Sequence, residues 1–86
     1  MVIFNILSIA YQSKGEYQFS IDIMLQALKL NSNNILFLNN IGISYHKIDE
    51  FDKAEKYFLR GIEVNPNYIN VLNNLGNLKK DLNLFY

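Results

Sequence analysis

The 86-residue sequence is that of an all-α domain built from stacked helical hairpins. Its segments recur at a constant offset of 34 residues, so that Tyr11 corresponds to Tyr45 (45 − 11) and Gly42 to Gly76 (76 − 42). Apolar residues follow one another at intervals of three and four, which indicates helices and not strands. A period of this length is typical of helix–turn–helix units that stack into a solenoid. Such arrays mainly present surfaces to partners.

Five antiparallel helices are expected, over residues 2–13, 17–30, 35–47, 51–64 and 69–82. The connections between them are only three or four residues long, which makes neighbouring helices antiparallel. Pro66 ends the fourth helix, because proline cannot continue a helix and disfavours helical angles in the residue before it.

Three equivalent positions mark the corners that follow the first helix of each unit, namely Gly15, Asp49 and Asn83. Glycine, aspartate and asparagine all tolerate the turn and left-handed backbone angles that a tight corner requires. We also expect the side-chain oxygen of Asp49 to cap the helix that begins at residue 51.

Small residues recur in phase within the apolar stripes. Glycine inside a helix costs about 1 kcal/mol relative to alanine, so its recurrence at Gly42 and Gly76 needs a reason. Close approach of the paired helix would supply one, and small Ala54 on the second helix fits the same pattern. The large partners, such as Tyr45 and Phe58, are expected in the core and not in a ligand site.

These residues resemble the tetratricopeptide repeat (TPR) family. The middle unit fits along its whole length, through Leu38, Ile41, Gly42, Tyr45, Phe51, Ala54, Phe58, Gly61 and Pro66. The resemblance implies one domain, 1–86, with repeats at 1–34 and 35–68 and a half repeat at 69–86. Residues 1–34 match more loosely, and Lys79 replaces an expected aromatic in the half repeat. The resemblance further implies a right-handed superhelix whose first helices line a concave groove that binds extended peptides.

The resemblance places a set of peptide-binding residues in that groove: Asn5, Ile9, Gln12, Leu36, Asn39, Asn40, Ile43, His46, Lys47, Asn70, Asn73, Asn74 and Asn77. An amide has both donors and acceptors, so a row of asparagines can hold the backbone of an extended chain. The row is similar to the asparagine ladder in the TPR arm of a glycosyltransferase. The alternative is that these asparagines are solvated residues enriched by a nucleotide bias of the source genome.

One ligand known for the family does not fit. Co-chaperone TPR domains clamp a C-terminal carboxylate with two lysines, an arginine and two asparagines, whose positions are here Asn5, Ile9, Asn40, Asn70 and Asn74. Only Asn40 matches. With every cation missing, the desolvation of a carboxylate would go uncompensated.

Composition excludes several function classes. Eight basic and eight acidic residues cancel, so no basic field would attract nucleic acid or an anionic membrane. The apolar first ten residues lack the basic start of a signal peptide and are too short to span a bilayer. The absence of cysteine excludes disulfides and permits a reducing compartment, so we expect a cytoplasmic location.

No enzyme or cofactor is expected. The chain has no phosphate-binding loop, nucleophile elbow or paired carboxylates. His46 is the only histidine and has no cysteine or tight carboxylate cluster beside it, so it is interpreted as a groove residue and not a metal ligand.

The expected partner is a protein or peptide, and a second copy of the chain is the alternative. The helix at 69–82 has no following helix to cover its apolar residues, which predicts a self-association edge at Leu72, Leu75, Leu78, Leu82 and Phe85. Two structural roles therefore stay open beside peptide binding: a self-associating module, or a part of a larger TPR array such as the targeting arm of an enzyme.

Overall fold

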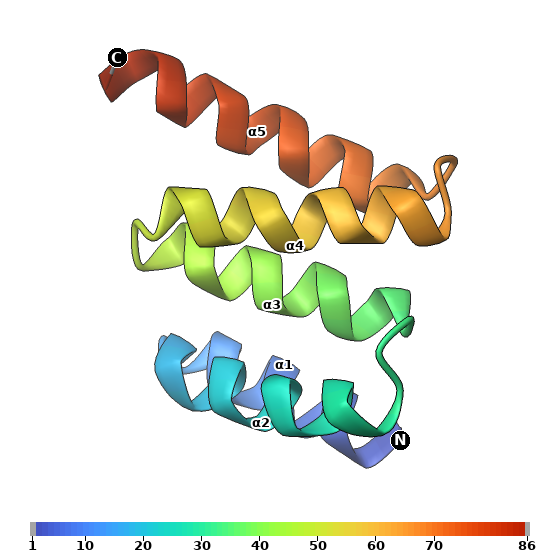
Figure 1. Cartoon of the computed structure of the whole chain (residues 1–86). Coiled ribbons are helices and arrows are strands. Elements are labelled where there is room, and N and C mark those ends of the chain that lie inside the picture. The colour runs from blue at the N-terminus through green and yellow to red at the C-terminus, as the bar shows by residue number, and fades with distance from the viewer. Residues whose placement is uncertain (1, 86) are drawn as a thin grey trace.

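The computed structural model describes the backbone of residues 2–85 and the side chains of residues 4–83. No residue in this part of the chain is in a strand. It forms five helices (Figure 1): α1 (Val2–Ser13), α2 (Tyr17–Leu30), α3 (Ile35–Lys47), α4 (Phe51–Val64) and α5 (Ile69–Phe85). The first four have the predicted bounds, which confirms the all-α fold. No helix of the described chain is both long enough and apolar enough to cross a bilayer.

Only the end of α5 differs from the prediction, because the helix passes through Asn83 and ends at Phe85. The expectation of a corner at Asn83 was wrong. Within the described residues no helix turns back from α5, so nothing requires asparagine to leave helical angles there.

The helices stack in chain order, each packed against the next (Figure 1). The three A helices, α1, α3 and α5, also pack side by side, since α3 contacts both α1 and α5. The two B helices, α2 and α4, both pack on α3, and their backbones do not come close to each other. The molecule therefore has one face formed by A helices and an opposite face on which the B helices are separated.

Both corners use a residue in the left-handed region, as predicted. The φ angle is 78° at Gly15 and 63° at Asp49. The expectation that Asp49 caps α4 was wrong. Asp49 lies in the turn, one residue before the N-cap position of α4. Glu50 occupies the N-cap position, and no side chain accepts a hydrogen bond there. The amide of Glu50 instead donates to the carbonyl of Tyr45 at 2.9 Å, which closes the end of α3.

One helix start depends on a cap that the sequence analysis missed. The side-chain oxygen of Asn34 accepts hydrogen bonds from the amides of Leu36 at 3.0 Å and Phe37 at 3.2 Å. This satisfies two of the amides that the first turn of α3 leaves without helical partners. The signal was present, since asparagine directly precedes the predicted helix.

The core consists of two apolar clusters. One lies between α2 and α3 and contains Met24, Ala27, Leu28, Phe37, Leu38 and Ile41. The other lies between α4 and α5 and contains Ala54, Phe58, Val71 and Leu78. Tyr45 of α3 packs against both clusters and so joins the two halves of the stack.

The two in-phase glycines differ in their surroundings. A Cβ atom at Gly42 would lie only 2.4 Å from a ring carbon of Phe58, which confirms that α4 approaches α3 closely there. At Gly76 nothing lies within 4 Å of the same point, so the predicted close approach was wrong for α5. The reason is the same as at Asn83: no described helix packs on that side of α5.

Candidate functional site

The face formed by α1, α3 and α5, called the A face here, carries the predicted binding residues. The helices bring them together from three segments of the chain, because α3 packs between α1 and α5. Within this set, the structure separates side chains that are exposed on the A face from side chains that bond to a neighbouring helix.

Four of the predicted asparagines bond to each other across the A helices. The Nδ2 atom of Asn40 donates to Oδ1 of Asn5 at 2.5 Å, and Nδ2 of Asn74 donates to Oδ1 of Asn39 at 2.8 Å. Each pair is 35 residues apart, so the same bond repeats from one A helix to the next. We call these two bonds the amide ladder; it links α1 to α3 and α3 to α5.

The amide ladder corrects one expectation. Asn39 and Asn40 were expected to be exposed, but their relative exposure is only 8% and 9%. They are buried because the A helices lie close enough for the amides to meet. Each bond occupies one of the two N–H donors of one amide and one acceptor site of the other. These four asparagines therefore have fewer donors and acceptors left for a ligand. The sequence signal was an asparagine at the fifth position of one repeat and at the sixth of the next.

Gln12 also faces a neighbouring helix. Its Nε2 atom donates to the carbonyl of Asn40 at 3.1 Å and to Oγ of Ser44 at 2.9 Å. Ser44 donates in turn to Oγ of Ser20 at 3.3 Å, and Ser20 lies 2.6 Å from Oγ of Ser8. All three serines are fully buried. Gln12 is therefore the outer end of a hydroxyl network that joins α1, α2 and α3.

His46 lies between α3 and α5. Its Nε2 atom is 2.5 Å from Oδ2 of Asp81, and its ring meets that of Phe51 edge-on with centroids 5.8 Å apart. The histidine is half-buried and connects helices, whereas the sequence analysis placed it in the groove as a solvated residue. Among the described residues, no group of three histidines, cysteines or acids could hold a metal ion.

The remaining predicted residues are available at the surface. Ile9 is 47% exposed and Leu36 45% exposed, while Ile43 is half-buried and packs against the α4–α5 cluster. The exposed polar members are Lys47, Asn70, Asn73 and Asn77. The amides of Asn70, Asn73 and Asn77 make no hydrogen bond to another described residue. The open part of the A face is therefore apolar on α1 and α3 and amide-rich on α5.

The predicted self-association edge is only partly open. Leu72 is exposed, whereas Leu75 and Leu82 are half-buried against the cluster that α5 forms with α4. Leu78 is fully buried, so its assignment to an open edge was wrong. The side of α5 that carries Leu78 packs on α4. The side chain of Phe85 lies outside the described residues.

Sequence reasoning missed the space between α2 and α4. Two neighbouring hollows of about 330 and 410 Å³ lie there and share Ser32 and Arg60 in their walls. The missing signal was spatial, because the two hollows together combine residues of α2, α3, α4 and the connection before α3.

Tyr45 of α3 lies against α4. Its ring stacks on that of Tyr57, with centroids 5.8 Å apart and planes inclined by 19°. Burial raises the pKa of the Tyr45 hydroxyl above its ordinary value, and the charges of Tyr57, Asp22 and Glu50 raise it further. The neutral phenol is therefore the form that this site favours.

Comparison with known proteins agrees with this geometry. Residues 35–68 match the family model "Tetratricopeptide repeat". A search among curated proteins finds no match. Among solved structures, the second TPR of Spaghetti (RPAP3) bound to the HSP90 peptide SRMEEVD is similar, with a TM-score of 0.89 at 20% sequence identity. The likeness covers 95% of this chain and 76% of that one. Residues 35–68 thus match a tetratricopeptide repeat, and the chain as a whole has the fold of a TPR domain.

Proposed function

We propose that the chain is a non-enzymatic scaffold that binds an extended segment of a partner protein across the A face. The observation that carries this proposal is the set of large apolar side chains left exposed there, Ile6, Ile9 and Leu36. The amide ladder holds the helices beneath them in place. Exposed apolar residues on such a surface, rimmed by polar groups, are typical of a protein interaction site.

The asparagines of α5 are proposed to hold the backbone of the bound segment. Asn70, Asn73 and Asn77 are exposed, and each offers an amide donor and acceptor that no described residue uses. An extended peptide presents its own N–H and C=O groups at intervals, so these amides can bind it with little regard to its side chains. The specificity then comes from the apolar contacts on α1 and α3.

The similar solved structure supplies a precedent for peptide binding and not for the ligand. The second TPR of Spaghetti (RPAP3) is bound to an acidic HSP90 peptide. In this chain the clamp positions of the family's carboxylate-binding members hold Asn5, Ile9, Asn70 and Asn74, and none of these is a cation. We therefore propose an apolar internal segment, and not a free C-terminus, as the ligand on the A face.

A peptide selection tests this proposal. Peptides from a random phage library would be selected on the full chain and measured against the double variant Ile9→Asp, Leu36→Asp. Because both changes place a charge where an apolar side chain must be buried, binding should weaken by roughly tenfold or more. The control is Leu30→Asp, which makes the same kind of substitution once, at a 70% exposed residue of α2. Equal binding by all three proteins would contradict the proposal.

A second candidate function is assembly through the outer side of α5. Leu38 of α3 and Leu72 of α5 are equivalent residues, yet Leu38 is fully buried and Leu72 is 43% exposed. Gly42 lies under the ring of Phe58, whereas the space above Gly76 is open. Helix α5 thus presents the surface that α4 covers on α3, and we propose that a helix from a second copy can cover it.

Sedimentation of the full chain tests the second candidate. The chain should be a dimer at high micromolar concentration, and Leu72→Asp should make it a monomer while peptide binding on the A face is retained. A wild-type chain that stays monomeric under those conditions would rule out this role.

A further inference from the structure

The groove between the B helices is a surface that the proposed function does not use. It consists of the two neighbouring hollows, whose walls are formed by Leu25, Leu28, Lys29, Ser32, Asn33, Leu38, Arg60, Glu63 and Val64. The groove exists because α2 and α4 pack on α3 without their backbones coming close to each other. It lies on the opposite side of α3 from the A face, so a ligand there would not compete with one on the A face.

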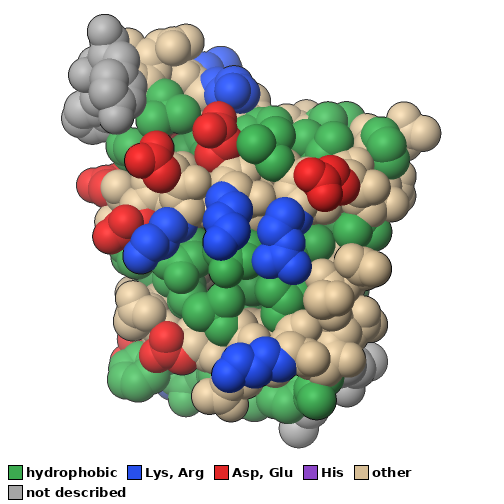
Figure 2. Space-filling model, viewed as in Figure 1, with side chains coloured by type: hydrophobic (Ala, Val, Ile, Leu, Met, Phe, Trp, Pro, Cys, Tyr) green, Lys and Arg blue, Asp and Glu red, His purple; other side chains and the backbone are tan. Residues whose placement is uncertain are grey.

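Basic side chains flank this groove on both sides. Figure 2 shows a row of them at the level of α4, with a band of apolar side chains below the row and a further basic side chain at the level of α2. The basic residues of α4 are Lys53, Lys56 and Arg60, and that of α2 is Lys29. These are four of the eight cations in the chain. Of these four, Lys29 and Arg60 line the groove itself.

The cations of α4 are held over aromatic rings and not by acids. The Nζ atom of Lys53 lies 5.6 Å from the centre of the Tyr45 ring, and Nζ of Lys56 lies 5.4 Å from that of Tyr57. The guanidinium of Arg60 lies 5.4 Å from the same Tyr57 ring. In the described part of the chain, the ion pairs are His46–Asp81 and Lys79–Glu55, which include none of these cations. Arg60 also donates from Nη2 to the carbonyl of Ser32 at 3.3 Å. Its other donors and the charges of the two lysines are left available to a ligand.

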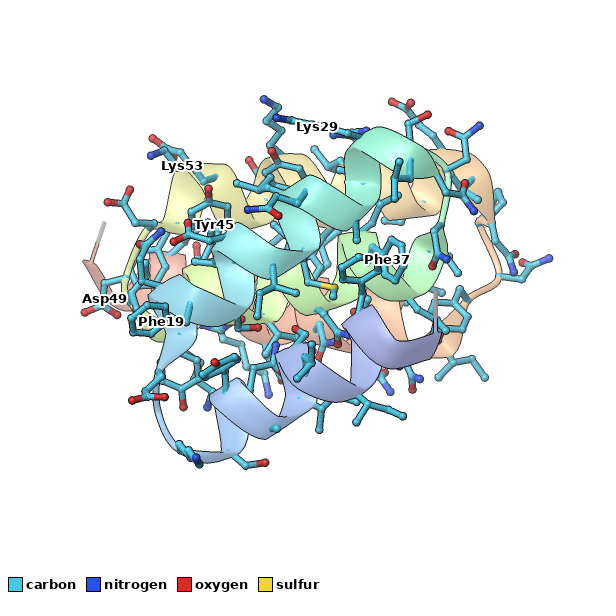
Figure 3. The ribbon with its side chains drawn as sticks, turned by 90° about the horizontal axis from the view of Figure 1, so that it is seen from below. Phe19, Lys29, Phe37, Tyr45, Asp49 and Lys53 are labelled. Carbon is cyan, nitrogen blue, oxygen red and sulfur yellow. The ribbon has the colours of Figure 1, made fainter. Side chains whose placement is uncertain are left out.

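The groove and the cations face the same way. In Figure 3, Lys29, Tyr45 and Lys53 lie toward one side of the molecule, away from α1. Arg60 and Lys29 both line one hollow, together with the apolar side chains of Leu25 and Leu28. This hollow therefore combines an apolar floor with a positive charge at either side.

The spacing of the cations fits an extended polypeptide. Lys53 and Arg60 are seven residues apart on a helix, which places them about 10 Å apart along its axis. An extended chain covers that length in about three residues. A segment with acidic residues a few positions apart could reach successive cations and still direct an apolar side chain between Leu25 and Leu28.

We propose that this groove binds an acidic, extended segment of a partner protein that carries a large aliphatic or aromatic residue. The apolar residue lies on Leu25 and Leu28, and the flanking carboxylates pair with Lys29 and Arg60. Glu63 lines the neighbouring hollow, so the acidic residues are confined to the part of the groove next to the cations. That acidic wall disfavours a nucleic acid, because a polynucleotide carries a charge on every phosphate and would meet Glu63 as well.

The test compares peptide binding by the full chain and by the variant Lys29→Glu, Arg60→Glu. Peptides from a random phage library would be selected on the full chain and counter-selected on this variant. The surviving peptides should be rich in Asp and Glu, contain a large apolar residue, and bind the variant roughly tenfold more weakly or worse. Their binding should also weaken as salt is raised, since the charges are at the surface.

Two further variants keep the test conclusive. Lys14→Glu, Lys80→Glu makes the same change of charge away from the groove and should bind the selected peptides like the wild type. Lys29→Gln, Arg60→Gln removes the charges with little loss of side-chain volume and should also weaken binding, and circular dichroism would show that each variant is folded. The proposal is overturned if no selected peptide distinguishes the groove variants from the control. It is also overturned if the distinguishing peptides lack acidic residues. An oligothymidylate added as a nucleic-acid probe gives the last outcome: if the groove variants lose binding to this probe and to no peptide, the proposal is overturned.

The experiment separates this groove from the A face. Peptides that depend on Lys29 and Arg60 should bind the Ile9→Asp, Leu36→Asp variant with wild-type affinity. Peptides that lose binding to both variants would show that a single surface was selected, which contradicts a second site in this groove.

Discussion

At the scale of single residues, Gly42 and Gly76 show how one repeat position can have two different surroundings. Both lie within an A helix at equivalent positions, but only Gly42 is covered by a following helix. The packing of Phe58 explains why α3 has a glycine at this position. No such packing explains the glycine on α5, where the described chain leaves the position open.

Alanine at each glycine should change stability in opposite directions. At Gly42 the new Cβ would lie 2.4 Å from the Phe58 ring, so Gly42→Ala should lower the free energy of unfolding by about 1–3 kcal/mol. At Gly76 the methyl group meets nothing, and Gly76→Ala should raise it by up to about 1 kcal/mol. Urea unfolding followed by circular dichroism measures both. Equal effects of the two changes would show that the close approach of Phe58 is not what sets the cost.

The amide ladder predicts that Asn40 contributes mainly to stability. Its Nδ2–Oδ1 bond to Asn5 joins two helices that are far apart in sequence, and the residue is nearly buried. Asn40→Ala should lower the free energy of unfolding by about 1 kcal/mol or more. The control Asn73→Ala removes an exposed amide and should change stability by no more than about 0.5 kcal/mol.

A double-mutant cycle of Asn5 and Asn40 would assign the loss to their bond. The two single changes should cost more in sum than the double change, because the second removes a group whose partner is already gone. Additive costs would contradict the ladder.

At the scale of elements, much of the fold could be predicted from the sequence. The 34-residue period and the apolar spacing gave the bounds of α1 to α4, because each helix buries a stripe of residues such as Leu38 and Phe58. The left-handed corners at Gly15 and Asp49 followed from residue type. The period also predicted a corner at Asn83, and it failed there because no helix follows within the described chain.

The candidate site was less predictable than the fold. Periodicity correctly placed the asparagines on the A helices but could not show that Asn39 and Asn40 meet amides of the neighbouring helices. Whether a polar residue faces a ligand or a neighbour depends on the distance between helices, which sequence spacing does not fix. The B-helix groove was missed for a related reason, since Leu25 and Arg60 belong to helices whose backbones do not come close to each other.

The buried serines predict a further effect at the contact of three helices. Ser20 of α2 lies between Ser8 of α1 and Ser44 of α3. Ser20→Ala should lower the free energy of unfolding by about 1 kcal/mol, because it leaves the buried Ser8 hydroxyl without this partner. Ser8→Ala in the same chain should recover part of that loss, as measured by urea unfolding. A fully neutral Ser20→Ala would show that Ser8 finds another partner.

At the scale of the whole molecule, Tyr45 links the two apolar clusters and makes stability depend on pH. Its raised pKa means that the folded state favours the neutral phenol. This contribution is fully present below the unfolded pKa of about 10 and is lost as the pH rises through the folded value. Wild-type stability should therefore fall more steeply above pH 10 than that of Tyr45→Phe, in urea titrations at several pH values. Parallel pH curves would contradict this role of the Tyr45 hydroxyl.

The molecule as a whole offers two separate surfaces. The A face combines Ile9 and Leu36 with the unpaired amides of α5, and the B-helix groove combines Leu25 with Lys29 and Arg60. The helix α3 lies between them and contributes to both. The amide ladder links α1 to α3 and α3 to α5, and the hydroxyl network links α1, α2 and α3.

The central claim is that the A face binds an extended partner segment, and its most direct test is a map of amide chemical shifts. A peptide selected on the full chain would be titrated into the isotopically labelled protein and followed by NMR. The largest changes should cluster at Ile9, Leu36, Asn73 and Asn77, with little change at Leu25 or Arg60. Changes confined to α2 and α4, with the A-face signals unmoved, would contradict the claim.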